Sequence, residues 1–126
     1  MSLVMYRGHL LIMIRVYGLK NCDVCRKAIK DLKEANIAYE FCDFRRDGLE
    51  IVKIEEWERS LGYVSLLNRR GTTWRGLSQS DKADLNNEKA IALMFNNPAL
   101  IKRPIFETEN KIVIGYTENQ IKELGL

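Results

Sequence analysis

The sequence has few of the residues that build metal sites. It contains one histidine and three cysteines in 126 residues. A structural zinc site needs four ligands, and outside the pair Cys22 and Cys25 only Cys42 and His9 are of a suitable type. A single core of this size folds without metal or disulfide staples. We therefore predict no bound metal, and we expect Cys42, inside a predicted strand, to be a packed core thiol.

Long apolar runs are also absent. The run LLIMI at residues 10–14 is far too short to span a bilayer, and no small-residue cleavage site of a signal peptide follows it. With an odd number of cysteines, these features lead us to expect a cytoplasmic protein with no membrane association. In a reducing compartment a C-x-x-C pair is more often catalytic or metal-binding than structural.

No strong excess of one charge points to nucleic acid. The net charge is +3, from basic and acidic residues that are interleaved, and no predicted helix carries a basic face with base-reading residues. Hydrophobic residues make up 46% of the chain and charged residues 29%, as in an ordinary globular protein. We expect one packed domain over residues 1–126 and no direct binding of nucleic acid.

The first third of the chain predicts a βαβ unit. Leu10–Tyr17 is nearly all apolar and ends at Gly18, which is typical of a buried strand. Asp23–Ala35 carries one apolar stripe at spacings of three and four, which predicts a helix that Asn36 can end. Ile37–Phe44, rich in aromatic and β-branched residues, predicts a second strand, and parallel strands need such a helical crossover.

The remainder predicts a helical middle and a ββα end. We expect helices at 51–62 and after Asn86, with a polar irregular stretch at about 67–80. PIFE and KIVIG predict a hairpin, and Thr117 with Gln120 forms a capping box that begins a last helix. The predicted fold class is α/β: a thioredoxin-like sheet with a helical insertion at about 49–100, between the βαβ and ββα halves.

The stretch YGLKNCDVCRKA, residues 17–28, places two unequal thiols at a helix start. Cys22 falls at the N-cap, where unpaired backbone N–H groups and the helix dipole lower a cysteine pKa. Arg26, on the same face, adds positive charge, whereas Asp23 opposes it. Cys25 falls on the buried stripe, where it either resolves a mixed disulfide at Cys22 or is only a small core residue. After a buried strand, this arrangement predicts a thioredoxin-like redox motif.

Arginines elsewhere are candidates for holding an anion beside Cys22. Arg103 precedes Pro104 at the head of the predicted hairpin, where an X-Pro bond can be cis, and in a thioredoxin-like sheet this loop lies opposite the C-x-x-C. Arg69 and Arg70 lie in NRRGTTWRG together with Trp74. This second group is either a solvated basic loop or a site for acidic groups such as a glutathione carboxylate.

Three stretches, YGLKNCDVCRKA, LLNRRGTTWRGL and NPALIKRPI, resemble the arsenate reductase (ArsC) family over nearly the whole chain from about Leu11. The likeness is greatest to YffB-type proteins, whereas CxxCRKA is similar to Spx-type transcription regulators. The resemblance implies a thioredoxin-like fold, Cys22 as nucleophile and Arg26 in a C-x3-R anion loop. It further implies that Arg69 or Arg70, with Arg103, supplies two of three substrate arginines; the third would fall in IGYTEN, where Tyr116 stands instead.

Three functions follow from this resemblance. The first is a thiol-dependent reductase with no bound cofactor, whose reductant is glutathione or another thiol and whose substrate is a disulfide or a small oxyanion. The second is arsenate reduction, which the missing third arginine disfavours. The third is an Spx-like redox regulator that binds RNA polymerase.

Overall fold

The protein is described by a computed structural model, which covers residues 2–6 and 9–126, with side chains from Met13 onward. The chain forms two compact units. The first comprises the residues up to Asp47 and from Arg103 to Leu126, and the second comprises Gly48–Lys102. The second unit contains the residues for which the sequence predicts the helical insertion. Within the described residues, every helix is too short or too polar to cross a bilayer.

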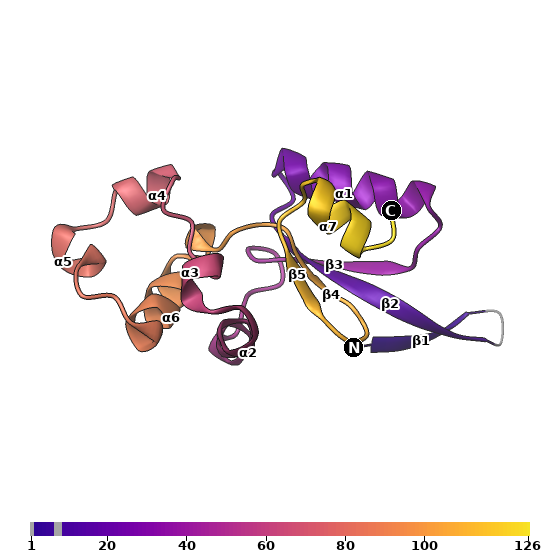
Figure 1. The fold of residues 1–126 in the computed structure, drawn as a ribbon, viewed down its shortest axis with the longest axis horizontal. Coiled ribbons are helices and arrows are strands. Elements are labelled where there is room, and N and C mark those ends of the chain that lie inside the picture. The colour runs from indigo at the N-terminus through magenta and orange to yellow at the C-terminus, as the bar shows by residue number, and fades with distance from the viewer. Residues whose placement is uncertain (1, 7–8) are drawn as a thin grey trace. The chain divides into compact units, whose positions relative to one another are not determined.

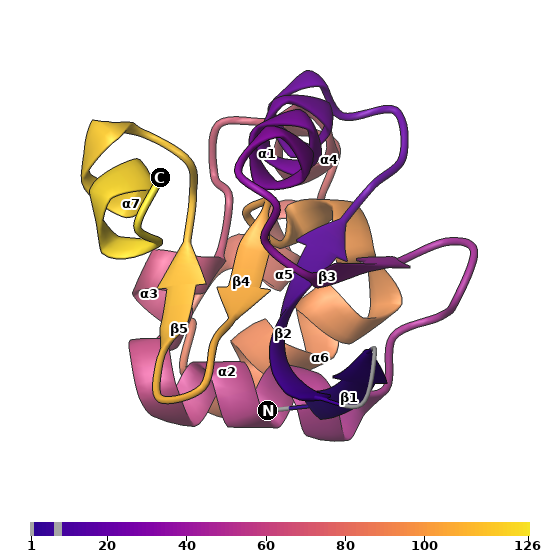
Figure 2. The same cartoon turned by 90° about the vertical axis from the view of Figure 1, so that its right-hand side faces the viewer.

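The first unit is built on a mixed sheet around one central strand (Figures 1 and 2). The central strand β2 pairs in parallel with β3 and antiparallel with β4, and β4 pairs antiparallel with β5. The first half of β2 also pairs with β1, a strand that the sequence analysis does not predict. The predicted thioredoxin-like α/β sheet is thereby confirmed. The strands are β1 (Ser2–Tyr6), β2 (His9–Gly18), β3 (Tyr39–Asp43), β4 (Ile105–Glu107) and β5 (Ile112–Ile114).

Two helices, α1 (Asp23–Glu34) and α7 (Glu118–Glu123), lie on one face of this sheet (Figures 1 and 2). The apolar stripe of α1 packs on the strands, and burial of such side chains is the main favourable term in folding. Both helix starts follow the prediction, because α1 begins after Cys22 and Gln120 accepts a hydrogen bond from the backbone of Thr117 at 2.7 Å. The core residues include Val16, Ala28, Leu32, Phe106 and Val113.

The second unit is helical. Its core is formed by fully buried residues that include Ile54, Trp57, Leu66 and Met94. The prediction of an irregular stretch at 67–80 is wrong in part, because two single-turn helices lie in it or begin in it. Helices of four residues show no hydrophobic period, so the sequence pattern does not reveal them. The helices are α2 (Ile51–Leu61), α3 (Tyr63–Leu66), α4 (Thr72–Arg75), α5 (Gln79–Lys82), α6 (Asn87–Asn96) and the 3₁₀ turn η1 (Pro98–Leu100).

Gly18, at the end of β2, allows the thiol of Cys25 to approach the backbone. A Cβ atom added at Gly18 would lie 2.4 Å from Sγ of Cys25, which is far inside van der Waals contact. We expect Gly18→Ala to lower the free energy of unfolding by about 1–3 kcal/mol, the usual cost of overpacking a core. Urea denaturation followed by circular dichroism measures this loss.

Gly76→Ala is the matched control. Gly76 has φ −81°, which alanine adopts readily, and an added Cβ would find its nearest heavy atom at 3.5 Å. This substitution should leave the free energy of unfolding unchanged or raise it by about 0.4–1 kcal/mol. A loss at Gly18 no larger than that at Gly76 would contradict the close approach of Cys25.

Candidate active site

The loop between β2 and α1 is held in place by the carboxylate of Asp43, at the end of β3. Asp43 is 5% exposed and accepts hydrogen bonds from the backbone N–H groups of Lys20 at 2.7 Å, Arg45 at 2.7 Å and Arg46 at 3.0 Å. Burial raises the pKa of Asp43, but these N–H groups outweigh burial and lower it overall. The ionised carboxylate therefore ties the loop before Cys22 to the neighbouring strand.

Sequence reasoning missed Asp43. A signal was present, because an aspartate followed closely by free backbone N–H groups is typical of an Asx turn. The sequence DFRRDG at residues 43–48 has this form.

Cys22 is the N-cap of α1 and is half-buried. Burial raises the pKa of its thiol, whereas the backbone N–H of Cys25, the thiol of Cys25 and the guanidinium of Arg103 lower it. The lowering effects prevail, so the pKa of Cys22 lies below its ordinary value. A thiolate is the nucleophilic form of cysteine, and this environment favours it.

Cys25 has the opposite character. Its side chain is fully buried, and burial, together with the neighbouring Cys22, raises the pKa of its thiol to about 12, against the lowering effects of the Leu19 backbone and Arg103. The two thiols are therefore unequal, as the sequence predicts. The thiolate form is therefore favoured at Cys22, whereas Cys25 stays protonated at neutral pH.

Arg103, from a distant part of the chain, lies beside the two cysteines. Its positive charge lowers the pKa of both cysteines, which places the guanidinium beside the pair. The peptide bond between Arg103 and Pro104 is cis, and the carbonyl of Pro104 accepts a hydrogen bond from the N–H of Gly115 at 2.9 Å. Pro104 is fully buried and leads directly into β4.

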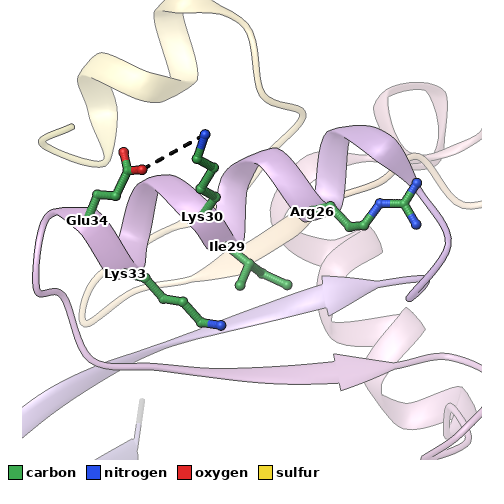
Figure 3. Close-up of a pocket in the computed structure, with 5 residues that line it drawn as sticks. All are labelled: Arg26, Ile29, Lys30, Lys33 and Glu34. Carbon is green, nitrogen blue, oxygen red and sulfur yellow. Dashed lines mark ion pairs between the residues drawn. The ribbon is translucent and has the colours of Figure 1, made fainter.

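Arg26 was expected to hold an anion beside Cys22. Its guanidinium forms an ion pair with the carboxylate of Asp23, and it extends outward from the first turn of α1 (Figure 3). The cation that most lowers the pKa of Cys22 is Arg103. The spacing C-x3-R predicts a common helix face but not the competing partner one turn earlier. A role of Arg26 in holding an anion beside Cys22 stays a prediction.

Arg69 and Arg70 belong to the second unit, and both are exposed. The guanidinium of Arg69 lies 5.6 Å from the ring centroid of Trp74, and the carbonyl of Arg70 accepts a hydrogen bond from Arg75 at 2.7 Å. Together with Asn68 and Lys102, they line a cavity of about 390 Å³ in that unit. Their predicted contribution to binding a substrate at Cys22 stays a prediction.

Tyr116 lies near the place, in or just after the second hairpin strand, where the family resemblance implies a third arginine. Its hydroxyl donates a hydrogen bond to Asp31 at 2.7 Å, and the Nζ of Lys27 lies 5.2 Å from its ring centroid. Its ring also packs against Phe106 of the core at 5.8 Å between centroids. Tyr116 therefore joins α1 to the segment after β5 and contributes no positive charge.

Cys42 is half-buried, so the expectation of a packed core thiol is wrong. Its strand β3 pairs with β2, and its Sγ lies 3.6 Å from a carboxylate oxygen of Glu40. Burial and Glu40 raise the pKa of Cys42 to about 11. In the described part of the chain, no group of three or more histidine, cysteine, aspartate or glutamate side chains forms a metal site. The side chain of His9 lies outside that part.

Two curated relatives match most of the chain. One is a protein of uncharacterised function from Haemophilus influenzae, 42% identical over 108 residues, which are 86% of this chain and 95% of the relative. The other is the global transcriptional regulator Spx of Listeria innocua, 30% identical over 112 residues, which are 87% of this chain and 85% of the regulator.

Two solved structures share the fold and much of the sequence. A YFFB protein is 36% identical with a TM-score of 0.83, over 87% of this chain and 96% of that one. An arsenate reductase (ArsC) related protein from Brucella melitensis is 32% identical with a TM-score of 0.72, over 88% of this chain and 92% of that one. The ArsC family model matches residues 17–124. The chain belongs to the ArsC family.

Proposed function

We propose that this protein is a cytoplasmic thiol-dependent reductase that uses Cys22 as its nucleophile and glutathione as its reductant. The observation that carries the proposal is the lowered pKa of Cys22, at the N-cap of α1 and beside Arg103. A cysteine with this environment attacks disulfides at neutral pH, because part of it is already thiolate. Membership of the ArsC family and the ArsC-related structures support a thiol-based reaction.

The reaction begins when the thiolate of Cys22 attacks one sulfur of a disulfide. A new sulfur–sulfur bond forms at Cys22, the original disulfide bond breaks, and the other sulfur leaves as a thiolate that takes a proton from water. When the substrate is a glutathione mixed disulfide and the glutathione sulfur is attacked, Cys22 becomes glutathionylated. The positive charge of Arg103 stabilises the thiolates that enter and leave.

The second half of the reaction needs a thiol to attack the Cys22 mixed disulfide. With a pKa of about 12, Cys25 supplies almost no thiolate at neutral pH. When Cys22 is in a mixed disulfide, its thiolate no longer raises the pKa of Cys25. Burial, the largest cause of the raised pKa, remains. A second glutathione therefore resolves the intermediate, forms oxidised glutathione and restores the Cys22 thiolate. Cys25 then acts as a buried core residue and a hydrogen-bond donor to Cys22.

Arsenate is the weaker substrate. Tyr116, near the place where the resemblance implies a third arginine, is uncharged and donates a hydrogen bond to Asp31. A multiply charged oxyanion would lose one charge-assisted contact there, whereas a disulfide does not need it.

A regulatory role is the second candidate, and the 30% identity to Spx of Listeria innocua favours it. In that case formation of a disulfide between Cys22 and Cys25 would change a surface that binds RNA polymerase. The protein, held reduced or held as the disulfide, should then bind purified RNA polymerase in a pull-down, and to a different extent in the two states. Absence of binding in both states removes this candidate.

A glutathione-coupled turnover assay with a small mixed disulfide tests the proposed reductase. We expect the wild type to turn over and Cys22→Ser to lose at least about 100-fold, because the nucleophile is gone. Cys25→Ser is the matched control in the same motif, and it should keep activity within about tenfold, since glutathione resolves the intermediate. Loss of activity in Cys25→Ser equal to that in Cys22→Ser would contradict the monothiol reaction, and turnover only with arsenate would favour the arsenate alternative.

A further inference from the structure

We propose that the substrate of Cys22 is an acidic polypeptide segment that carries a glutathionylated cysteine, and that it binds along a basic surface beside Cys22. This inference rests on the proposed reductase function and adds the class of substrate. The basic surface is defined by Lys20, Arg26, Lys30, Lys33, Arg45 and Arg46, all in the first unit.

The first part of the basic surface adjoins the cysteine loop. A cavity of about 370 Å³ is lined by Leu19, Lys20 and Asn21, which immediately precede Cys22, and by Arg26. Arg45 and Arg46, after β3, line the same cavity. Asp43 also lines it, but its carboxylate is occupied by three backbone N–H groups. An anion held here would lie beside the loop residues that immediately precede Cys22.

The second part continues along α1. Arg26 also lines a second cavity, of about 500 Å³, with Ile29, Lys30, Lys33 and Glu34. Ile29 and Lys33 project on one side of α1, and Lys30 pairs with Glu34 on the other, at 3.9 Å (Figure 3). Because Arg26 is common to both cavities, the two form one surface that begins at the cysteine loop.

Among the described side chains, three cations on this surface form no ion pair with a carboxylate. Arg26 pairs with Asp23, and Arg46 pairs with Asp47. Among the residues whose side chains are described, Lys20, Lys33 and Arg45 form no ion pair, and all three are exposed. They are spread over both cavities, so an acidic ligand that contacts all three must extend along the surface.

The ligand that fits this surface is extended, acidic and able to make an apolar contact, and a polypeptide combines these three properties. Ile29 offers such a contact between cations, and Glu34 at the far end repels a uniformly anionic backbone such as that of a nucleic acid. None of the residues that line the two cavities is aromatic, so these residues offer bases no ring on which to stack. Glutathione alone is too short to reach Lys33, which lies three helical turns from Cys22, about 16 Å along α1 at 1.5 Å per residue.

The chemistry balances with glutathione as the reductant. The Cys22 thiolate attacks the glutathione sulfur of the mixed disulfide, and the cysteine of the polypeptide leaves as a thiolate and is protonated by water. A second glutathione then attacks the glutathionylated Cys22. The products are one reduced polypeptide and one oxidised glutathione, and Cys22 returns to its starting state.

The test compares three peptides of equal length, each with one glutathionylated cysteine, whose flanking residues are acidic, neutral or basic. We expect kcat/KM for the acidic peptide to exceed that for the basic peptide by about tenfold at low salt and the difference to shrink at high salt, where surface charges are screened. Lys33→Glu should lower kcat/KM for the acidic peptide by about fivefold. It should leave turnover of the small mixed disulfide of glutathione and mercaptoethanol unchanged.

Lys122→Glu on α7 is the matched control, because it changes the charge equally at an exposed lysine that forms no ion pair among the described side chains. It should alter kcat/KM for the acidic peptide by less than about twofold. Equal rates for the acidic and basic peptides, with the small disulfide turned over, would overturn this inference alone. No turnover of any disulfide would overturn the proposed function and the inference with it. Tighter binding of a DNA duplex than of the acidic peptide, by fluorescence anisotropy, would assign the surface to nucleic acid instead.

Discussion

The contact between the thiol of Cys25 and the backbone of Gly18 sets the geometry of the first unit around the cysteines. The thiol is fully buried, and it packs where β2 ends, at a position that has no room for a side chain. This contact fixes where α1 begins relative to the sheet. It also places Cys22, three residues earlier, at the N-cap, with the loop before it held by the carboxylate of Asp43. The burial of one thiol and the N-cap position of the other are thus linked through the same helix start.

The positive charge around the cysteines has two parts with different effects. Arg103, brought in from the far end of the chain by the segment before β4, acts on the sulfur atoms themselves. Arg26 and the other cations of the basic surface lie outward, where they meet solvent and other carboxylates. The first part lowers the pKa of Cys22, the proposed nucleophile. The second part is the surface along which we propose that the substrate binds.

Much of this could be read from the sequence, because local patterns determine it. The strand before Gly18, the helix after Cys22 and the unequal burial of the two cysteines follow from hydrophobic period and helix geometry, and the structure agrees with each. What the sequence did not predict depends on long-range pairing or on segments too short for a hydrophobic period. β1 is defined only by its pairing with β2, and the single-turn helices α4 and α5 have no period to detect. The role of Arg26 beside Cys22 stays a prediction, and the spacing C-x3-R does not reveal that Asp23 pairs with the same guanidinium. The Asx-turn pattern at Asp43 is local and could have been read from the sequence, but its bond to the distant backbone N–H of Lys20 is not displayed by any spacing.

Arg103 and the start of α1 together lower the pKa of Cys22 and favour its thiolate. The most direct measurement is the pH dependence of alkylation of Cys22 by iodoacetamide, with the modified residue identified by mass spectrometry, in the wild type, Arg103→Ala and Arg26→Ala. We expect a pKa for Cys22 below the reference of about 8.5, a clear rise in Arg103→Ala and a smaller change in Arg26→Ala. A wild-type pKa at or above the reference, or a larger rise in Arg26→Ala than in Arg103→Ala, would contradict this expectation.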